Sequence, residues 1–310
     1  MTQPPSVGVP ACYRHPSRET YVRCARCDRP ICPECMNEAS VGHQCPECVA
    51  AGRRTQRSAR TAFGGTVAGQ QGTVTKILIA INVAVALVGV LISGTGALLG
   101  RGLFTGVSAI QAIGAVHATG VTLMPNGEIL LGHAPGGTYA PGLDDGGWYR
   151  LITAMFIHYG LLHLLMNMWG LWILGRPLEA ALGRARFLTL YLLAGLGGNV
   201  AAYLFSPSSF AAGASTAIFG LFAAYAIVVR RLGGSLAGIL PILLINLYIT
   251  FFFPGISKAG HLGGLVVGAI VAAGLAYAPR NARTQVQSAV LGGVLVLLAF
   301  LTLLGPTLHG

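Results

Sequence analysis

The sequence predicts an all-α protein, a polytopic membrane bundle of about seven helices behind a small cysteine-rich module. Of its 310 residues, 54% are hydrophobic and only 9% are charged, whereas a soluble domain usually has about 25% charged residues. All seven cysteines lie between Cys12 and Cys48, ahead of the long apolar stretches. The formal net charge is +11, but membrane topology accounts for where the positive charges lie, so no nucleic-acid partner is expected.

Residues 1–50 form the predicted module. Its first residues lack the basic and apolar segments of a signal peptide, so we expect it in the reducing cytoplasm, where clustered cysteines favour a metal over disulfides. Four ligand pairs, each with two intervening residues, follow one another: Cys12 and His15, Cys24 and Cys27, Cys32 and Cys35, and Cys45 and Cys48. These eight side chains suffice for about two tetrahedral zinc sites. His43 is surplus to them.

The zinc is expected to be structural. About 37 residues bury too little apolar surface to fold alone, so metal binding would supply the folding energy. Filled ligand sets leave no open position for catalysis, and the expected role is contact with a cytoplasmic protein partner. Spacing alone leaves open which pairs share an ion. The module resembles a B-box-like, cross-brace zinc finger, which implies that the first pair joins the third and the second pair joins the fourth.

Residues 51–73 are polar, basic and rich in glycine, which predicts a flexible linker. A membrane span needs about 20 apolar residues. The apolar stretches that follow lie at 74–99, 161–176, 184–206, 215–230, 236–253, 260–278 and 287–305. The second and the fourth are short, which is tolerated where a helix lines a cavity.

The basic residues set the expected orientation in the cell membrane. They precede the first stretch and follow the second, fourth and sixth, as Arg53, Arg54, Arg57, Arg60, Lys76, Arg176, Arg184, Arg186, Arg230, Arg231, Arg280 and Arg283. The alternate loops contain only Arg101, Arg150 and Lys258. This positive-inside pattern predicts a cytoplasmic N-terminus and an outer C-terminus. The long loop at 100–147 would then face outside, followed by an interfacial helix at 148–159.

Polar side chains inside apolar stretches are costly and therefore suggest function. His163 and Asn167 share one helix face, and Ser215 and His261 begin two other stretches. Because all three stretches start from the outside, these side chains should lie at a similar depth. Ser215 is then the expected nucleophile and His261 its general base. No Asp or Glu lies inside any stretch, so a dyad is expected, without a catalytic cofactor.

Neighbouring residues would support this dyad. The Ser215 backbone N–H and the His163 and Asn167 side chains are candidate donors to an oxyanion. Gly213 would let the backbone approach the substrate. Phe219 lies one turn after Ser215 and could stack on the His261 ring. A packing face of Gly264 and Gly268, set against Gly220, would bring the two helices together.

With these motifs the chain resembles the rhomboid family of intramembrane proteases over residues 74–305. The matching residues are His158, His163 and Asn167 in HYGLLHLLMN, Gly213, Ala214 and Ser215 in GASTAIFG, and His261 in GHLGGLVVG. Trp148 and Arg150 resemble the family's first-loop pair, with Tyr149 inserted. Glu179, Gly183, Arg184 and Phe187 resemble its cytoplasmic pattern after the second helix. At Phe219 many members have Tyr, so stacking is kept and a hydroxyl contact is lost.

The resemblance implies six core helices at 74–280, an additional helix at 281–310 and cleavage of a substrate's transmembrane segment near the outer surface, usually after a small residue. Water must reach the site through a cavity open to the outside. Residues 206–214 contain Pro207 and Gly213, so we expect them to form a loop that dips toward the serine. Residues 251–256 are a candidate gate. Substrates with weak transmembrane helices should be cut best, because the scissile segment must unwind.

Other membrane functions fit less well. A metalloprotease would need a His-Glu-x-x-His motif, which His158 and His163 do not form. An aspartyl protease would need buried aspartates within the spans. A transporter would be expected to show inverted repeats and charged relay residues, and neither is evident. The alternative that stays open is a catalytically inactive client-binding protein whose zinc module recruits partners.

Overall fold

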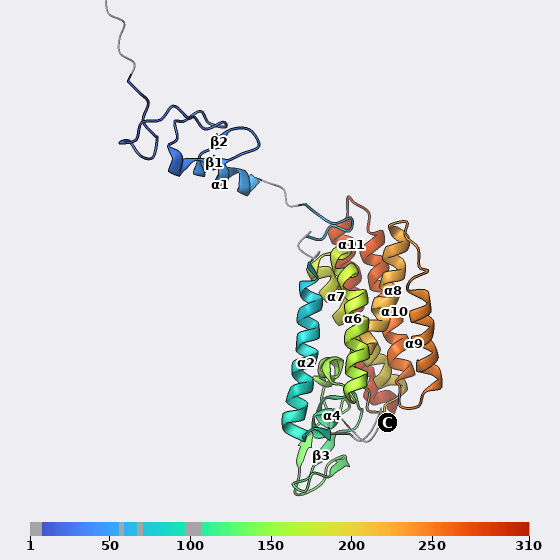
Figure 1. Ribbon diagram of the computed structural model, residues 1–310. Helices are drawn as coiled ribbons and strands as arrows, with labels where there is room; N and C mark the ends of the chain where they lie inside the picture. Colours follow the sequence, from blue (N-terminus) through green and yellow to red (C-terminus); the bar gives the residue numbers. More distant parts are fainter. Residues whose placement is uncertain (1–7, 56–58, 67–70, 97–106, 310) are drawn as a thin grey trace, which may run out of the picture. The chain divides into compact units, whose positions relative to one another are not determined.

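The computed structural model describes residues 8–55, 59–66, 71–96 and 107–309. The chain divides into two compact units, Met1–Ser58 and Ala59–Gly310 (Figure 1). The division falls inside the segment predicted to be a linker, parts of which (56–58 and 67–70) lie outside the described residues.

The small unit has little regular structure. It contains η1 (Pro33–Cys35), a hairpin of β1 (Asn37–Glu38) and β2 (His43–Gln44), and α1 (Pro46–Thr55). Its buried cluster consists of Ile31 and six cysteines, with Tyr13 and Met36 packed against it. A core built largely from thiols gives little hydrophobic stabilisation, which agrees with a unit that depends on metal.

The predicted linker is partly regular. Helix α1 continues to Thr55, five residues into the segment expected to be flexible. Further along, Phe63 is buried in the core of the large unit, and its carbonyl accepts a 3.3 Å hydrogen bond from Gln287. The glycine-rich composition predicted a flexible segment. The segment is nevertheless attached to the bundle through this one aromatic residue.

The large unit is a helical bundle, as predicted. Its helices are α2 (Thr73–Ser93), α6 (Leu161–Leu182), α7 (Arg184–Phe205), α8 (Ser215–Arg231), α9 (Leu240–Phe252), α10 (Lys258–Tyr277) and α11 (Arg283–His309). Each coincides with a predicted apolar stretch. The loop expected at 100–147 is described from residue 107 and contains α4 (Ala109–Gly114) and a sheet ordered β4-β3-β5, formed by β3 (Val121–Leu123), β4 (Ile129–Leu131) and β5 (Thr138–Ala140).

Not every helix is long enough to span a bilayer alone. Among the described residues, α2, α7, α10 and α11 meet the length and hydropathy expected of a span, and α6 joins them if it is counted with the bent segment before it. Helix α8 has 17 residues and α9 has 13. The second stretch, predicted to be short, belongs to a helix of 22 residues. Arg176 ends the apolar pattern there, but the helix continues to Leu182, and Leu178, Glu179 and Leu182 are buried.

The segment predicted as one interfacial helix, 148–159, is irregular. It forms the short α5 (Arg150–Thr153) and η3 (Ala154–Phe156), and this pair meets α6 at a bend of 91°. Gly160 lies at the bend with a φ of +94°, a conformation that favours glycine. Because of this bend, α6 starts beside η3. The polar side chains in the first turns of α6 therefore lie near the loop that precedes α8.

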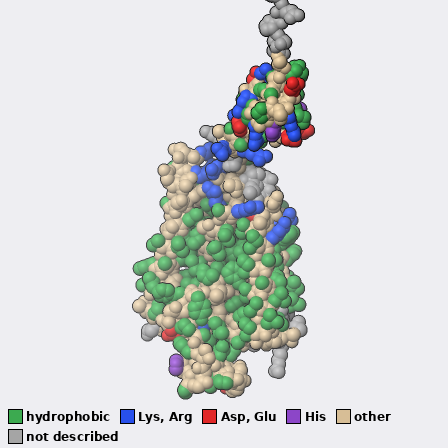
Figure 2. Space-filling view, turned by 90° about the vertical axis from the view of Figure 1, so that its left-hand side faces the viewer, with side chains coloured by type: hydrophobic (Ala, Val, Ile, Leu, Met, Phe, Trp, Pro, Cys, Tyr) green, Lys and Arg blue, Asp and Glu red, His purple; other side chains and the backbone are tan. Residues whose placement is uncertain are grey.

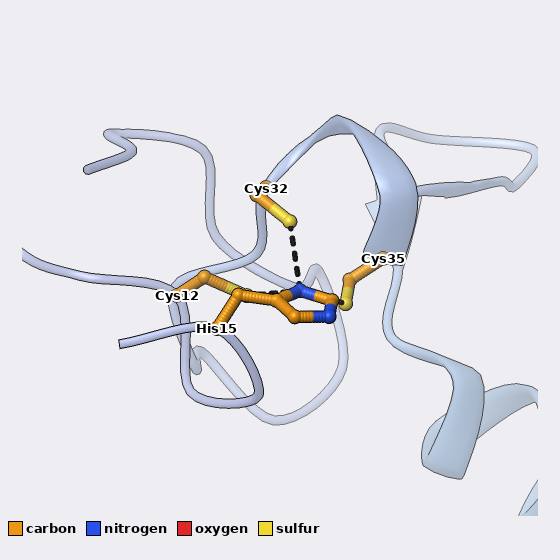
Figure 3. A group of neighbouring side chains, drawn as sticks. All are labelled: Cys12, His15, Cys32 and Cys35. Atoms are coloured by element: carbon orange, nitrogen blue, oxygen red, sulfur yellow. Dashed lines mark hydrogen bonds between the residues drawn. The ribbon is translucent and has the colours of Figure 1, made fainter. Parts of the chain in front are cut away.

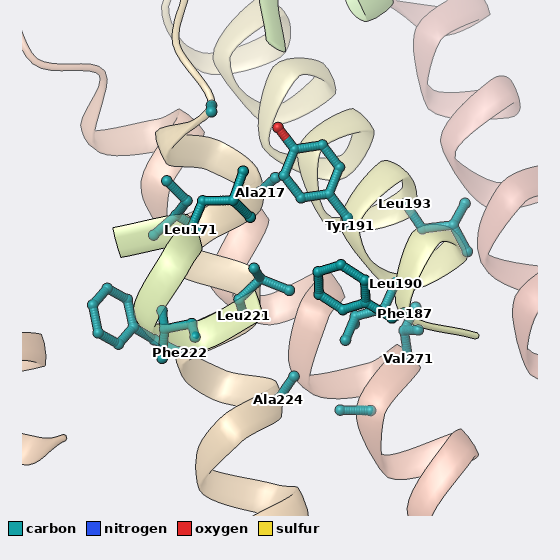
Figure 4. Packing of buried hydrophobic residues seen from close by; sticks show 14 of the residues in the cluster. Leu171, Phe187, Leu190, Tyr191, Leu193, Ala217, Leu221, Phe222, Ala224 and Val271 are labelled. Atoms are coloured by element: carbon teal, nitrogen blue, oxygen red, sulfur yellow. The ribbon is translucent and has the colours of Figure 1, made fainter. Parts of the chain in front are cut away.

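The centre of the bundle is formed by α7, α8 and α10. Helices α8 and α10 touch through glycine, since a Cβ on Gly268 would overlap the backbone of Gly220 and one on Gly264 would overlap the backbone of Thr216. The predicted small-residue packing face is therefore confirmed. Figure 4 shows the aliphatic and aromatic side chains that fill the space around these helices.

Charge and apolar surface are separated along the large unit. Figure 2 shows Lys and Arg side chains gathered toward one end of the bundle and hydrophobic side chains over its middle. At the basic end, Glu179 accepts hydrogen bonds from the backbone N–H groups of Val74 (3.0 Å) and Thr75 (2.9 Å), capping α2. Outward residues such as Leu91 and Val296 are 84% and 70% exposed, as expected for a face that contacts lipid.

Candidate active site and metal centres

The predicted serine and histidine meet at the end of α8 that lies opposite Arg230 and Arg231. Ser215 is the first residue of α8 and His261 lies in the first turn of α10. The distance from His261 Nε2 to Ser215 Oγ is 2.8 Å. The glycine contact between α8 and α10 makes this approach possible, because larger residues would hold the two helix starts apart.

Two side chains fix the plane of the His261 ring. Phe219 stacks on it with a centroid distance of 4.1 Å and an interplanar angle of 15°, as the sequence predicted. On the far edge of the ring, Thr250 Oγ1 lies 2.7 Å from Nδ1. Thr250 was not among the residues predicted for the site, since a lone threonine in an apolar helix usually bonds to its own backbone.

Gly213 belongs to the loop at 206–214 and lies beside the nucleophile. Its φ is +132°, and a Cβ built there would lie 2.8 Å from two atoms of the His163 ring and 3.4 Å from Ser215 Oγ. Its N–H donates to the Ala154 carbonyl at 2.8 Å. The predicted non-helical loop is thus present, and glycine is required by both conformation and space.

His163 and Asn167 bring hydrogen-bond donors to the groove that Ser215 lines, and His163 lies beside Gly213. The Tyr159 N–H donates to His163 Nδ1 at 3.2 Å, so in the neutral ring the proton lies on Nε2, the atom next to Gly213. The amide Nδ2 of Asn167 is buried and has no hydrogen-bond partner among the described residues. An unpaired buried donor is costly, and both His163 and Asn167 line the same groove as Ser215, where such donors are suited to a negative charge.

His158 supports this arrangement from behind. Its Nε2 accepts a long 3.5 Å bond from the Ala214 N–H, and its ring meets the His163 ring edge-on at 5.1 Å. Its carbonyl accepts from Gln111 Nε2 at 2.8 Å. His158 therefore connects α4 to the loop that carries Gly213, and Gln111 is a supporting residue that the sequence did not reveal.

Arg150 holds the outer loop together. Its buried guanidinium donates to the carbonyls of Pro141 (2.7 Å), Ala112 (2.7 Å) and Ala115 (3.0 Å). Its predicted motif partner Trp148 is 55% exposed and does not share this role. A buried arginine that bonds only backbone fixes the loop around it, because each lost bond would leave part of the charge unpaired.

A groove opens beside the dyad between α6 and α9. Both polar and apolar residues line it: Tyr159, Leu162, His163, Met166, Asn167, Trp169, Gly170, Phe210, Ala211, Ala212, Ser215, Thr216, Ile218, Phe219, Phe222, Ile242, Asn246, Ile249, Phe253, Gly255, Ile256, Ser257 and His261. The candidate gate at 251–256 supplies Phe253 and Ile256. An apolar groove with a few polar groups at one end is suited to an apolar segment whose backbone is bound at that end.

The cysteines and His15 of the small unit gather into two groups of four, Cys12, His15, Cys32 and Cys35, and Cys24, Cys27, Cys45 and Cys48. In each group the ligand atoms lie within 4.8 Å of one another. Figure 3 shows the first, where His15 Nδ1 lies 3.2 Å from Cys32 Sγ and 3.5 Å from Cys35 Sγ. The grouping is the alternate pairing that the cross-brace resemblance implied.

The second group also fits a metal. Zinc–sulfur bonds of about 2.3 Å in a tetrahedron place two sulfurs roughly 3.8 Å apart, and Cys27 Sγ lies 3.8 Å from Cys45 Sγ. Arg29 Nε donates to Cys27 Sγ at 3.3 Å and lowers the pKa of that thiol, which favours the thiolate that zinc requires. The donor set and its spacing are those of a closed structural site.

Known proteins are similar to the part of the chain that holds the dyad. Residues 145–278 match the model of the rhomboid domain. "Rhomboid protease GluP" of Bacillus subtilis is 39% identical over 141 residues, 43% of this chain and 27% of the relative. "Putative rhomboid protease YdcA" of the same species is 36% identical over 137 residues, 42% of this chain and 68% of the relative. "RHOMBOID-like protein 6, mitochondrial" of Arabidopsis thaliana is 38% identical, covering 39% of this chain and 41% of the relative.

Proposed function

The chain belongs to the rhomboid family, and from that premise we propose that it is an intramembrane serine endopeptidase that cleaves substrates in or near a transmembrane segment. The observation that carries the proposal is the 2.8 Å contact between His261 Nε2 and Ser215 Oγ beside an apolar groove. A hydrogen-bonded serine and histidine at the end of such a groove are suited to acyl transfer.

The reaction would follow the chemistry of a dyad. His261 Nε2 takes the proton of Ser215 Oγ as that oxygen attacks the scissile carbonyl, and the resulting imidazolium gives the proton to the leaving amine. Water then attacks the acyl–enzyme ester with His261 as base, which releases the second product and restores the serine. No described carboxylate contacts His261, so its orientation depends on neutral neighbours.

The negative charge of the tetrahedral intermediate would be held by donors that are already in place. His163 Nε2 lies beside Gly213, and the unpaired Asn167 Nδ2 belongs to a residue that lines the same groove as Ser215. The Ser215 N–H, at the first position of α8, needs no partner within its helix. Donors fixed before reaction stabilise the transition state without reorganisation, and removal of one typically costs about 10²–10³ in rate.

Substrate would enter the groove from the lipid. Its walls come from the α6 residues Leu162, Met166 and Trp169 and from the α9 residues Ile242 and Ile249. An apolar segment matches these walls, but its scissile bond must leave the helical state to reach Ser215, so weak transmembrane helices should be preferred. The basic end of the bundle would face the cytoplasm and the dyad the outer side.

For the small unit, we propose two structural zinc ions and a cytoplasmic protein partner. The residues that would hold the metal are the two groups of four ligands. When bound, zinc would supply folding energy to a unit whose core is mostly thiol. Neither group contributes to the hydrolytic chemistry proposed for Ser215.

The proposed function is tested by cleavage of a fluorogenic transmembrane peptide in liposomes. Wild type should cleave, Ser215→Ala should not, and Ser288→Ala, an exposed serine on α11, should match wild type. Circular dichroism must show that all three are folded. Equal cleavage by Ser215→Ala and wild type would exclude Ser215 as the nucleophile. Absence of cleavage in every protein across several peptides would favour an inactive client-binding protein.

A further inference from the structure

Helix α9 contributes one buried side chain to the bundle, and that side chain touches the base. Along its length α9 exposes large apolar residues, among them Leu244, Tyr248 and Phe252, whereas Thr250 is 1% exposed. Burying a hydroxyl costs free energy unless it is hydrogen-bonded. Thr250 Oγ1 has two partners, the Asn246 carbonyl at 2.7 Å and His261 Nδ1 at 2.7 Å.

These two bonds determine the direction of the hydrogen bonds along the dyad. A hydroxyl has one proton to donate, and Thr250 donates it to the Asn246 carbonyl. Its oxygen can then only accept from His261, so Nδ1 must carry the proton of the neutral ring. Nε2 is left with its lone pair toward Ser215 Oγ, which is the tautomer that a general base needs.

We propose that Thr250 is a positioning residue for the reaction: its hydroxyl holds His261 in the base-competent tautomer and accepts from the imidazolium that forms when Ser215 attacks. The inference rests on the proposed function for its kinetic consequence, while the tautomer itself follows from geometry alone. Phe219 fixes the ring plane from one face, but a stacked phenyl ring has no acceptor and cannot select between the two nitrogens.

The helix that lines the substrate groove thus also orients the base. Ile249, the neighbour of Thr250 on α9, lines the groove, so a movement of α9 away from α10 would free His261 Nδ1 at the same time as it widened the groove. A base held by a separate, weakly packed helix is competent only while that helix is in place.

The test compares Thr250→Val, which keeps the shape and removes the hydroxyl, with Thr250→Ser, which keeps the hydroxyl. In the peptide cleavage assay we expect Thr250→Val to lower kcat about 10- to 100-fold, less than loss of a buried carboxylate does, with KM changed less than twofold. Thr250→Ser should recover most of kcat. Thr302→Val is the matched control, because Thr302 on α11 is buried and bonds the Leu298 carbonyl in the same way without touching histidine.

A second measurement reports the tautomer without relying on proteolysis. In ¹⁵N-histidine NMR of the full chain in lipid, with the His261 signals assigned by their loss in His261→Ala, wild type should show a protonated Nδ1 and an unprotonated Nε2. Thr250→Val should show a mixture. A protonated Nε2 in wild type, or equal kcat in Thr250→Val and wild type, would overturn the proposal. Failure of wild type to cleave any peptide would refute the proposed function and leave the NMR result to decide on Thr250.

Discussion

Gly213 shows how a single residue satisfies two requirements at the candidate site. Its φ of +132° is rarely adopted by other residues, and the space where a Cβ would lie is taken by the His163 ring, 2.8 Å away. The sequence suggested that glycine frees the backbone there. It could not show that the freed space holds the His163 ring, because the position of that ring depends on the 91° bend before α6.

For this single residue, we predict that Gly213→Ala lowers kcat/KM by about 10²–10³, comparable to the loss of one oxyanion donor. The reason is that the added methyl group would push the His163 ring aside. The matched control is Gly238→Ala, where a Cβ has open space. Cleavage kinetics in liposomes and thermal unfolding of both variants check this. Undiminished turnover by a folded Gly213→Ala would mean that the His163 edge is not needed for catalysis.

Among the elements, helices were easier to predict than their ends. Each apolar stretch became a helix, because hydropathy in a bilayer leaves few other structures. The end of α6 was missed since Glu179, a charged residue, is buried as the cap of α2. The contribution of α9 to the site was missed because nothing in the sequence distinguishes Thr250 from other threonines in apolar helices. Its importance comes from its contact with His261, which lies on another helix.

The contact between α8 and α10 gives a prediction about elements. Gly268→Ala should destabilise the bundle by about 1–3 kcal/mol through overpacking, since its Cβ would overlap the Gly220 backbone, and it should slow cleavage by separating Ser215 from His261. Gly292→Ala on α11, where a Cβ meets nothing within 4 Å, is the control. Equal unfolding midpoints and equal turnover for the two variants would contradict a tight interface.

For the whole molecule, the sequence indicated a membrane bundle and a metal-binding module, and the structure divides into compact units at Ser58. The spacing of the zinc ligands could not show which pairs share an ion, because the two ligands of every pair are separated by the same two residues. Only the fold of the small unit brings the first pair against the third. The burial of Phe63 in the bundle could not be predicted either. A single aromatic residue in a polar segment does not form the repeating hydrophobic pattern from which a buried helix or strand is predicted.

For the whole molecule, we predict about two zinc ions per chain, measured by elemental analysis of the full-length protein purified without chelator. Replacing Cys24 and Cys27 together by serine should remove about one ion and leave peptide cleavage unchanged, because these ligands belong to the small unit. His43→Ala, outside both groups, should retain both ions. A protein with no zinc, or a double variant that keeps two ions, would contradict the assignment.

The measurement that tests the central claim most directly is the site of covalent labelling by a fluorophosphonate, which phosphonylates an activated serine and displaces fluoride. Peptide mass spectrometry of the labelled full-length protein in lipid should place the adduct on Ser215. His261→Ala should abolish that adduct by removing the base 2.8 Å from the nucleophile. An adduct on another serine, or labelling of Ser215 that persists at the same rate in His261→Ala, would contradict a serine–histidine dyad.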